Sequence, residues 1–533
     1  MLFAVGPLTG WLPGDDRYAA VTKSPQTGGF LDTYGGGSFP GRLAGALDGH
    51  QLLLVTGAAD EPVRIVVEAG EARIEPADDW WGLDAVELGS RASGASVAGI
   101  GPAGERRVTY ATIASDGGDH HAGRGGAGAV MGAKRLKAVV ARGEPAALPT
   151  ALEPLRERAE ARYAASGPGR WHRSGGTAES VDFADAVGGL ATRGWRSGRF
   201  EGAEGVGVEA VRGQAATRER DGEDVPGDFR IGLGEKLHRG AAGMTLGAGL
   251  GIDDADAVAR LEATCDRLGI DLVSGGNVLA WLVRAGEAGH LDAPLTFGDP
   301  DGAERALEAI AGRETPLADA LADGVQAAAA RFGGEGLVPS VKGLELPNYD
   351  PRAAPSMALA YATSDRGACH RRARPIEREP FDAEWSPAEA AEAVIDEQHR
   401  RAASWCLIAD DFVDAGLGEE AAEWLAAIGH PADEAALDSL GERVWTLTRL
   451  FNRREGWGRA DDALPAALTE PTEDDGRAVD PDRFEAMLDA YYDRRGWDAE
   501  GRPRRALLDR LGMADLVEDS SSIDGATPRP AED

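Results

Sequence analysis

The stretch from Asp116 to Lys137, DGGDHHAGRGGAGAVMGAKRLK, decides how the first part of this chain is interpreted. It holds six glycines between Gly117 and Gly128, with two histidines and an arginine among them. Glycines let backbone N–H groups approach a ligand closely, so the run suits an anion or a cofactor phosphate. The spacing matches neither the P-loop nor the dinucleotide-binding fingerprint. His120 and His121 could ligate a metal, although adjacent loop histidines are more often only solvated.

On the N-terminal side of this stretch, glycine and β-branched residues dominate. The segments Gln51–Thr56, Val63–Val67 and Arg107–Ile113 have the composition of strands. Three glycine-marked elements precede these segments, GPLTG at 6–10, RYAAVTKSPQTGG at 17–29 and Gly35–Gly37, while GPAGE at 101–105 stands just ahead of Arg107. Arg17 and Lys23 could supply positive charge for a phosphate. The alternative is that these motifs are only tight turns between strands.

On the C-terminal side, alanine-rich segments with apolar residues at helical spacing predict helices. They are 151–165, 254–268, 277–288, 317–332, 387–411 and 438–452. We therefore predict an α+β fold with a β-rich domain at 1–147, a helical middle domain at 148–335 and a helical C-terminal domain at 336–518. The polar segment 519–533 is expected to be a disordered tail. A chain of 533 residues is long enough for several cores.

Composition restricts the partners and the location. The net charge of −34 disfavours nucleic acid and anionic membranes. No apolar stretch is long enough to span a membrane, Met1–Trp11 has no basic segment typical of a signal peptide, and none of the three cysteines forms a CxxC pair. We expect a cytoplasmic protein without disulfides.

The basic residues are 51 arginines and only five lysines. Dispersed acidity with so little lysine favours a halophilic protein, and a GC-rich genome is the alternative. Lys23, Lys134, Lys137 and Lys342 lie in glycine- or proline-marked blocks, which indicates a specific task unless chance placed them there.

Two later motifs offer further candidates. In CDRLGID, at 265–271, Gly269 is placed to end a helix, and Asp266 and Asp271 flank that turn. They could accept hydrogen bonds from a polar heterocycle, or could simply be solvated. KGLELPNYDPR at 342–352 precedes YATSDRGACH at 361–370, where His370 is a candidate acid or base. Ordinary hydrogen bonding is the alternative for this histidine.

Together and in this order, these motifs resemble the aldehyde:ferredoxin oxidoreductase family from Gly6 to about Trp497. GTAESV at 176–181 and ERVWTLTRLFNRREGWGRADDALP at 442–465 extend the resemblance. It implies a tungsten (or molybdenum) bis-pterin cofactor with a magnesium ion bridging the pterin phosphates. It also implies oxidation of an aldehyde to a carboxylic acid, with electrons passing through a [4Fe–4S] cluster to ferredoxin, and it allows a homodimer.

By the same resemblance, His370 corresponds to a proton donor or acceptor and Cys406 to a late cluster ligand. Tyr34 and His121 would contribute backbone carbonyls. The positions that match cofactor-binding residues of the family are Arg17, Tyr34, Gly36, His121, Gly123, Arg124, Asp266, Ile270, Asp271, Arg372 and Leu407.

The sequence departs from the family in four places. Residues 211–246, where the family has C-x-x-C-x-x-x-C, contain no cysteine. KLHRGA at 236–241 replaces an acidic E-G-P-E-Y-E element, and RAASWC at 401–406 replaces D-x-x-G-L-C. The family's usual first strands are also expected to be missing ahead of GPLTG.

A [4Fe–4S] cluster needs about four thiolates. We therefore predict that this chain alone holds none, and that Cys406 is a free, mostly buried thiol. The alternative function is a degenerate paralogue that binds pterin or a partner subunit without turnover.

Overall fold

The computed structural model describes residues 1–12, 16–91, 93–165, 176–220, 230–231, 235–236, 238–409 and 420–518. Helices account for 49% of the structure and strands for 13%, and the strands are concentrated in the first part of the chain, which confirms the α+β prediction. The predicted tail at 519–533 lies outside the described residues. No helix in the described ranges is long and apolar enough to cross a bilayer.

The first sheet has four strands in the order β3-β2-β1-β4, and every neighbouring pair is antiparallel. Helix α1 (Phe39–Leu47) packs its apolar residues into the same core as β1 and β2. The strands are β1 (Leu2–Val5), β2 (Tyr18–Lys23), β3 (Phe30–Gly35) and β4 (Leu52–Leu54).

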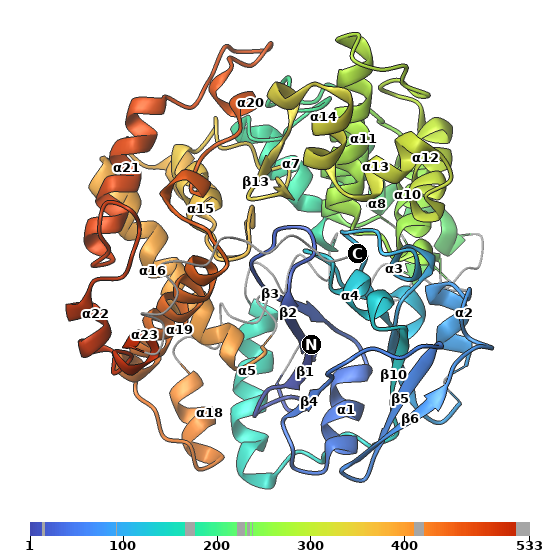
Figure 1. The fold of residues 1–533 in the computed structure, drawn as a ribbon, viewed down its shortest axis with the longest axis vertical. Coiled ribbons are helices and arrows are strands. Elements are labelled where there is room, and N and C mark those ends of the chain that lie inside the picture. Colours follow the sequence, from blue (N-terminus) through green and yellow to red (C-terminus); the bar gives the residue numbers. More distant parts are fainter. Residues whose placement is uncertain are drawn as a thin grey trace.

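The second sheet has six strands in the order β6-β5-β10-β7-β8-β9. Its central strand β10 (Leu136–Ala141) has all six residues buried, runs parallel to β5 and runs antiparallel to β7. The other strands are β5 (Val63–Glu68), β6 (Glu71–Pro76), β7 (Ser96–Gly99), β8 (Ile113–Ser115) and β9 (His120–Ala122). Figure 1 shows this sheet and the first sheet at the base of the molecule.

The predicted strand Arg107–Ile113 is wrong, because only Ile113 belongs to a strand. Arg107 has a φ of +59°, and its N–H donates to the carbonyl of Gly104 at 2.9 Å, so the chain turns here. The turn follows α3 (Pro102–Glu105), the short helix formed by the GPAGE motif. Two further short helices of the first domain are α2 (Ala85–Ser90) and α4 (Ala127–Ala133).

The middle of the chain folds as a group of helices around one large core. The predicted helix 277–288 begins earlier, at Leu272, because Asp271 caps it. The predicted helix 317–332 is two helices, since the chain breaks at Gly324, whose φ is +91°. The helices are α7 (Glu179–Val187), α8 (Val208–Arg220), α9 (Gly240–Ala242), α10 (Ala255–Leu268), α11 (Leu272–Glu287), α12 (Pro300–Gly312), α13 (Pro316–Ala322) and α14 (Val325–Phe332).

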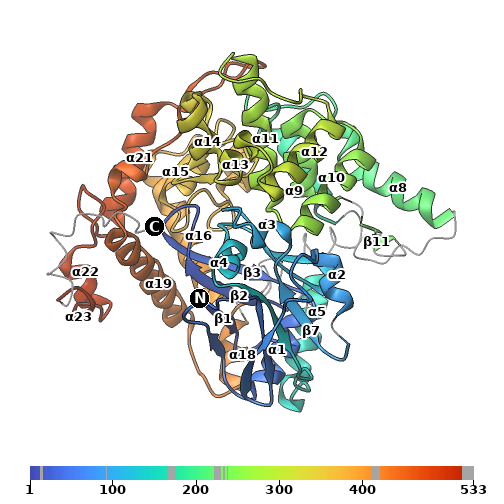
Figure 2. The same ribbon diagram turned by 45° about the vertical axis from the view of Figure 1, so that its right-hand side comes forward.

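The last part of the chain is a second helical group with its own core. Helix α16 begins with a capping box between Ser386 and Glu389 and ends at Cys406, and the rest of the predicted segment 387–411 is described only to residue 409. Figure 2 shows this group standing beside the first sheet. Its helices are α15 (Pro355–Thr363), α16 (Pro387–Cys406), α18 (Ala421–Ala427), α19 (Glu434–Arg454), α20 (Ala466–Thr469), α21 (Pro481–Arg494), α22 (Arg505–Arg510) and α23 (Asp515–Glu518).

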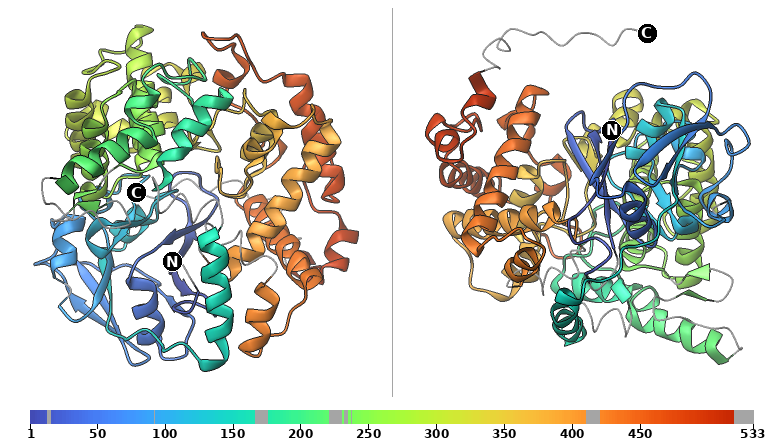
Figure 3. Two further views of the ribbon diagram at one scale, coloured as in Figure 1. Left: turned by 180° about the vertical axis from the view of Figure 1, so that it is seen from behind. Right: turned by 90° about the horizontal axis from the view of Figure 1, so that it is seen from below.

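Helix α5 (Glu153–Ala165) lies beside α18, as the view from behind in Figure 3 shows. A smaller hydrophobic cluster joins Leu155 of α5 and Trp424 of α18 to Leu8 and Leu407. The GPLTG motif and the end of α16 are thus held together by apolar contacts. The three-domain boundaries at 147 and 335 stay a prediction.

Candidate functional site

The turn between α10 and α11 fixes two of the predicted carboxylates. Gly269 ends α10 with a φ of +76°, a conformation that favours glycine. Ile270 is buried and forms a bridge with Ala111 beside the second sheet. The Asp271 carboxylate then caps α11 by accepting hydrogen bonds from the N–H groups of Val273 at 3.3 Å and Ser274 at 3.2 Å.

The His121 side chain connects the second sheet to the carboxylate of Asp266. Its Nε2 lies 3.2 Å from Asp266 Oδ1, and its Nδ1 lies 2.7 Å from the hydroxyl of Thr112. Arg239 approaches the same carboxylate from the other side, with its Nη2 donating at 2.9 and 3.0 Å. Asp266 is therefore held between the first domain and the middle helices.

Arg124 joins this corner to the segment that carries His370. Its Nη2 donates to the carbonyls of Glu345 at 2.5 Å and Ala368 at 3.0 Å, while its Nε lies 3.6 Å from Asp271 Oδ2. Its buried Nη1 has no hydrogen-bond partner among the described residues. A Cβ added at Gly123 would make ordinary van der Waals contact with Asp271 Oδ1 at 3.9 Å. A buried guanidinium N–H without a partner fits an anionic group.

Arg372 lies between two buried carboxylates. It donates through Nη2 to Asp32 of β3 and through Nε to Asp365 at 2.9 Å. Burial alone would raise the pKa of Asp32, but Arg372 and Arg366 outweigh it and lower that pKa overall. At Asp365 burial prevails over Arg372, and the pKa is raised. Arg372 thus ties the loop after α15 to the first sheet.

Tyr34 and Gly36 lie at the end of the same strand. The Tyr34 hydroxyl donates to Asp32 at 2.7 Å, and its ring stacks on Trp405 with a centroid separation of 4.0 Å. A Cβ at Gly36 would lie 2.3 Å from Nη1 of Arg17. Glycine is therefore needed at this position for the Arg17 guanidinium to lie against the strand end.

His370 is half-buried, with its ring centroid 5.3 Å from that of Tyr349. Burial lowers the pKa of His370 well below its usual value, and Arg374, Arg371 and Arg124 lower it further. The imidazole is therefore neutral near pH 7 and can accept a proton.

Cys369 precedes His370 and is fully enclosed. Its sulfur accepts a hydrogen bond from Arg366 Nη2 at 2.9 Å. Burial alone would raise the pKa of this thiol, but Arg366 and Arg372 outweigh it and lower the pKa. Cys265, in contrast, lies in the core of the middle helices, where burial raises the pKa well above its usual value.

The prediction that Cys406 is mostly buried is wrong, because its side chain is exposed at the end of α16. The protein atoms around the thiol still displace enough water to raise the pKa of Cys406 to about 11, and Asp32 adds to this shift. The next residue, Leu407, is buried, and its carbonyl oxygen would lie 1.9 Å from a Cβ at Gly6. Leu407 therefore packs on the GPLTG backbone.

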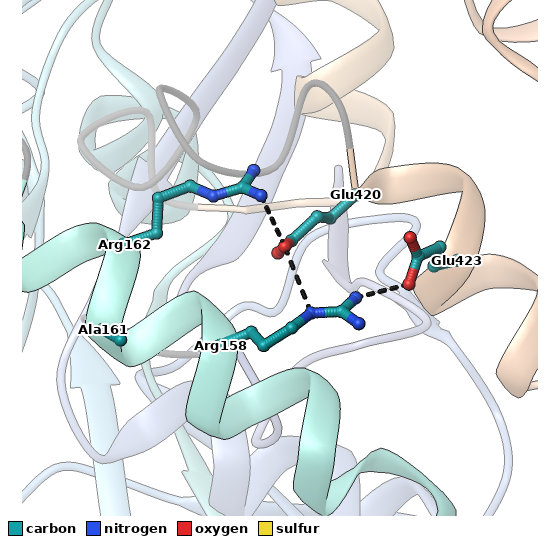
Figure 4. A pocket seen from close by; sticks show the side chains of 5 residues that line it. All are labelled: Arg158, Ala161, Arg162, Glu420 and Glu423. Carbon is teal, nitrogen blue, oxygen red and sulfur yellow. Dashed lines mark hydrogen bonds and ion pairs between the residues drawn. The ribbon is translucent and has the colours of Figure 1, made fainter.

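The described residues contain no group of three or more histidine, cysteine or acidic side chains that could hold a metal ion. A cavity of about 420 Å³ opens between α5 and α18, where Arg158 and Arg162 reach toward Glu420 and Glu423 (Figure 4). It contains none of the predicted site residues. The predicted residues instead gather in two groups that Arg124 connects.

Sequence reasoning missed several residues that organise the site. Asp365 and Arg366 stood inside the quoted YATSDRGACH motif, but only its histidine was assigned a role. Arg239 stood in KLHRGA, which the sequence marks as the loss of an acidic element. Asp32 and Trp405 carried no signal, because their importance comes only from the contacts made by folding.

The chain thus combines a β-rich first part with two groups of helices, and arginines and carboxylates pair where these parts meet. Residues 1–143 match the family model described as aldehyde ferredoxin oxidoreductase, N-terminal domain. Residues 155–513 match the model described as aldehyde ferredoxin oxidoreductase, domains 2 and 3. The chain belongs to the aldehyde ferredoxin oxidoreductase family.

Individual relatives agree over nearly the whole chain. The tungsten-containing aldehyde ferredoxin oxidoreductase of Pyrococcus furiosus is 32% identical, and the match covers 97% of this chain and 90% of that protein. The enzyme of the same description from Thermococcus kodakarensis is 33% identical with the same coverage. The WOR-like subunit of the aliphatic sulfonate oxidoreductase of P. furiosus is 24% identical over 98% of this chain and 89% of that subunit.

The fold is also that of a solved structure, the active-site complex BamBC of benzoyl coenzyme A reductase. The TM-score is 0.77 at 22% identity, and the match covers 98% of this chain and 91% of that one. At this identity the likeness concerns the fold alone.

Proposed function

We propose that this chain oxidises an aldehyde to a carboxylic acid at a tungsten bis-pterin centre. The observation that carries the proposal is the match to tungsten-containing enzymes over 97% of the chain. The local geometry supports it, because the buried Nη1 of Arg124 lacks a partner among the described residues.

The residues that would hold the cofactor have complementary chemistry. Arg17 and Arg124 would bind the pterin phosphates, because guanidinium groups bind phosphate through paired hydrogen bonds. A magnesium ion would neutralise part of the remaining phosphate charge. Asp266 and Asp271 would accept hydrogen bonds from ring N–H groups. When bound, the cofactor supplies the metal centre at which the aldehyde carbon is oxidised.

His370 would manage protons in this reaction. Oxidising an aldehyde with water to a carboxylic acid releases two protons and two electrons. The neutral imidazole of His370 can take up a proton near the reacting group, and its low pKa favours rapid release of that proton. Arg124, one of the residues that would bind the cofactor, contacts the segment that carries His370 through the carbonyl of Ala368. The residues that would bind the cofactor are called the cradle below.

The residues present do not fit a [4Fe–4S] cluster, because Cys406 has no second thiol from the stretch 211–246 to join it. Electrons would therefore pass to ferredoxin or to a partner subunit by a route that this chain does not supply alone. One relative is itself described as a subunit, which fits a partner of that kind. The cytoplasmic location, the halophilic character and a homodimer stay predictions.

The test is to purify the protein from a tungsten-supplied anaerobic host, measure tungsten per chain, and follow aldehyde-dependent reduction of a viologen dye. We expect tungsten to be present and dye to be reduced. His370→Gln should lower kcat by about 10²–10⁴-fold without changing tungsten content. His50→Gln, at an exposed position, is the control. Tungsten without turnover would favour the degenerate paralogue, and absence of tungsten would refute the proposal.

A further inference from the structure

Arg239 holds two acidic side chains of α10 at once. Its Nη2 donates to both oxygens of Asp266, while its Nε and its backbone N–H donate to the two oxygens of Glu262, the N–H at 2.8 Å. Glu262 and Asp266 are both buried. A single guanidinium therefore spans two carboxylates one helical turn apart.

This arrangement has a clear electrostatic reason. Carboxylates four residues apart lie on the same face of a helix and repel each other, and the repulsion increases when both are removed from water. Burial alone would lower the pKa of Arg239, but Asp266 and Glu262 outweigh it and raise the pKa. Arg239 is thus the cation that allows both charges to remain in the interior.

Asp266 is also fixed from the opposite side. His121 Nε2 lies 3.2 Å from Asp266 Oδ1 and 3.0 Å from the carbonyl of Gly118. The carboxylate is therefore clamped between a side chain of the first domain and one that precedes α9. Arg239 contacts both oxygens of Asp266 through the single nitrogen Nη2 and donates to Glu262 through Nε, so its guanidinium fork fixes the Asp266 carboxylate relative to Glu262.

We propose that Arg239 is a positioning residue of the cofactor site, which orients the Asp266 carboxylate toward the ring N–H groups of the bound pterin. The inference rests on the proposed function. It gives KLHRGA a role of its own, because the arginine in this segment supports a binding residue and does not simply mark a lost acidic group. Arg239 acts through Asp266 and has no contact with the substrate in this scheme.

The test compares Arg239→Gln and Arg239→Lys with the unchanged protein, all purified from the same tungsten-supplied host. Tungsten and pterin per chain are measured after gel filtration, together with the thermal midpoint. Arg267→Gln is the matched control, since Arg267 lies on α10 next to Asp266 but pairs with exposed Glu308 at 3.2 Å. Loss of a residue that orients a ligand typically weakens binding by about 10–100-fold, so we expect a fall of about tenfold or more in tungsten and pterin for Arg239→Gln.

Arg239→Lys separates orientation from charge. Lysine keeps the positive charge but has one donor nitrogen, which cannot replace both Nε at Glu262 and Nη2 at Asp266, so its tungsten content should also fall while its thermal midpoint stays close to that of the unchanged protein. Unchanged tungsten in Arg239→Lys would overturn the inference even if Arg239→Gln fails to fold. An equal loss in Arg267→Gln would overturn it as well. Absence of tungsten from the unchanged protein would refute the proposed function and this inference with it.

Discussion

Lys137→Met is the change whose effect the structure defines most closely. Lys137 is fully buried in β10, in a chain that has only five lysines. Its ammonium donates to the carbonyls of Leu83 and Ile100, both at 2.7 Å, and to the carboxylate of Glu105. The ion pair therefore ties the GPAGE motif to the central strand of the second sheet.

The expected cost follows from what the substitution leaves behind. Methionine fills a similar volume but leaves the Glu105 carboxylate, only 8% exposed, without its cation. Breaking a buried ion pair by removing one partner costs about 3–5 kcal/mol. Glu105 keeps one hydrogen bond from the N–H of Gly82 at 2.8 Å, so we expect the lower end, about 3 kcal/mol.

The assay is urea unfolding in molar KCl, combined with hydrogen exchange of the β7 and β10 amides. Lys134→Met is the control, because Lys134 is half-buried and its ammonium donates to the carbonyl of Gly57 instead of pairing with a buried carboxylate. The double substitution Lys137→Met with Glu105→Gln removes both charges and should recover at least half of the loss. The reasoning is refuted if Lys137→Met costs no more than Lys134→Met, or if the double variant is as unstable as the sum of the single ones.

Four further outcomes are expected. Burial, and after it Arg495, lowers the pKa of His399 to about 4, so the free energy of unfolding should fall by about 3 kcal/mol as pH drops from 6.5 to 4. His399→Gln should make this decline shallower, and a variant with the same pH profile as the unchanged protein would contradict the prediction. The thermal midpoint should rise between about 0.1 and 2 M KCl as salt screens the excess acidic charge, and a constant midpoint would exclude the halophilic interpretation. Reconstituted protein should contain well under one four-iron cluster per chain by iron and sulfide analysis, whereas a full cluster that disappears in Cys406→Ala would disprove this. Gly126→Ala should destabilise the protein by about 2 kcal/mol or more in a thermal or urea assay, because φ is +83° and the new Cβ would lie 1.9 Å from the Thr109 carbonyl oxygen. Gly117→Ala should cost less, because its φ is +69° but nothing lies within 4 Å of the new Cβ.

Local signals allowed the sequence to predict parts of the fold and the site. Gly269 ends α10 as its position after a periodic apolar segment predicted. Asp271 was assigned to the cofactor but also caps α11, and that second role explains why the helix starts five residues before the predicted position 277. Such features can be predicted from residue propensity and periodicity, because they depend on residues within one helical turn of each other along the chain.

Contacts between distant segments could not be predicted in the same way. Arg372 reaches Asp32 across 340 residues, and no composition signal marks that pair. The scarcity of lysine was informative only in part. Lys137 and Lys342 are buried in ion pairs, whereas Lys23 pairs with Glu455 at the surface. The same residue type serves different tasks, and only the folded partners distinguish them.

The cradle and the lost cluster ligands are separable in structural terms. The contacts that shape the cradle are those of Arg124 with the carbonyl of Ala368, of Arg372 with Asp32, and of His121 with Asp266. None of them uses a cysteine, and Cys406 is exposed at the helix end beside Asp32 and Arg372 without taking part in their ion pair. Loss of thiolates elsewhere therefore removes no hydrogen bond from the cradle. Under the proposed function, such a chain would keep the contacts for binding a pterin and moving a proton while its route for electrons changes.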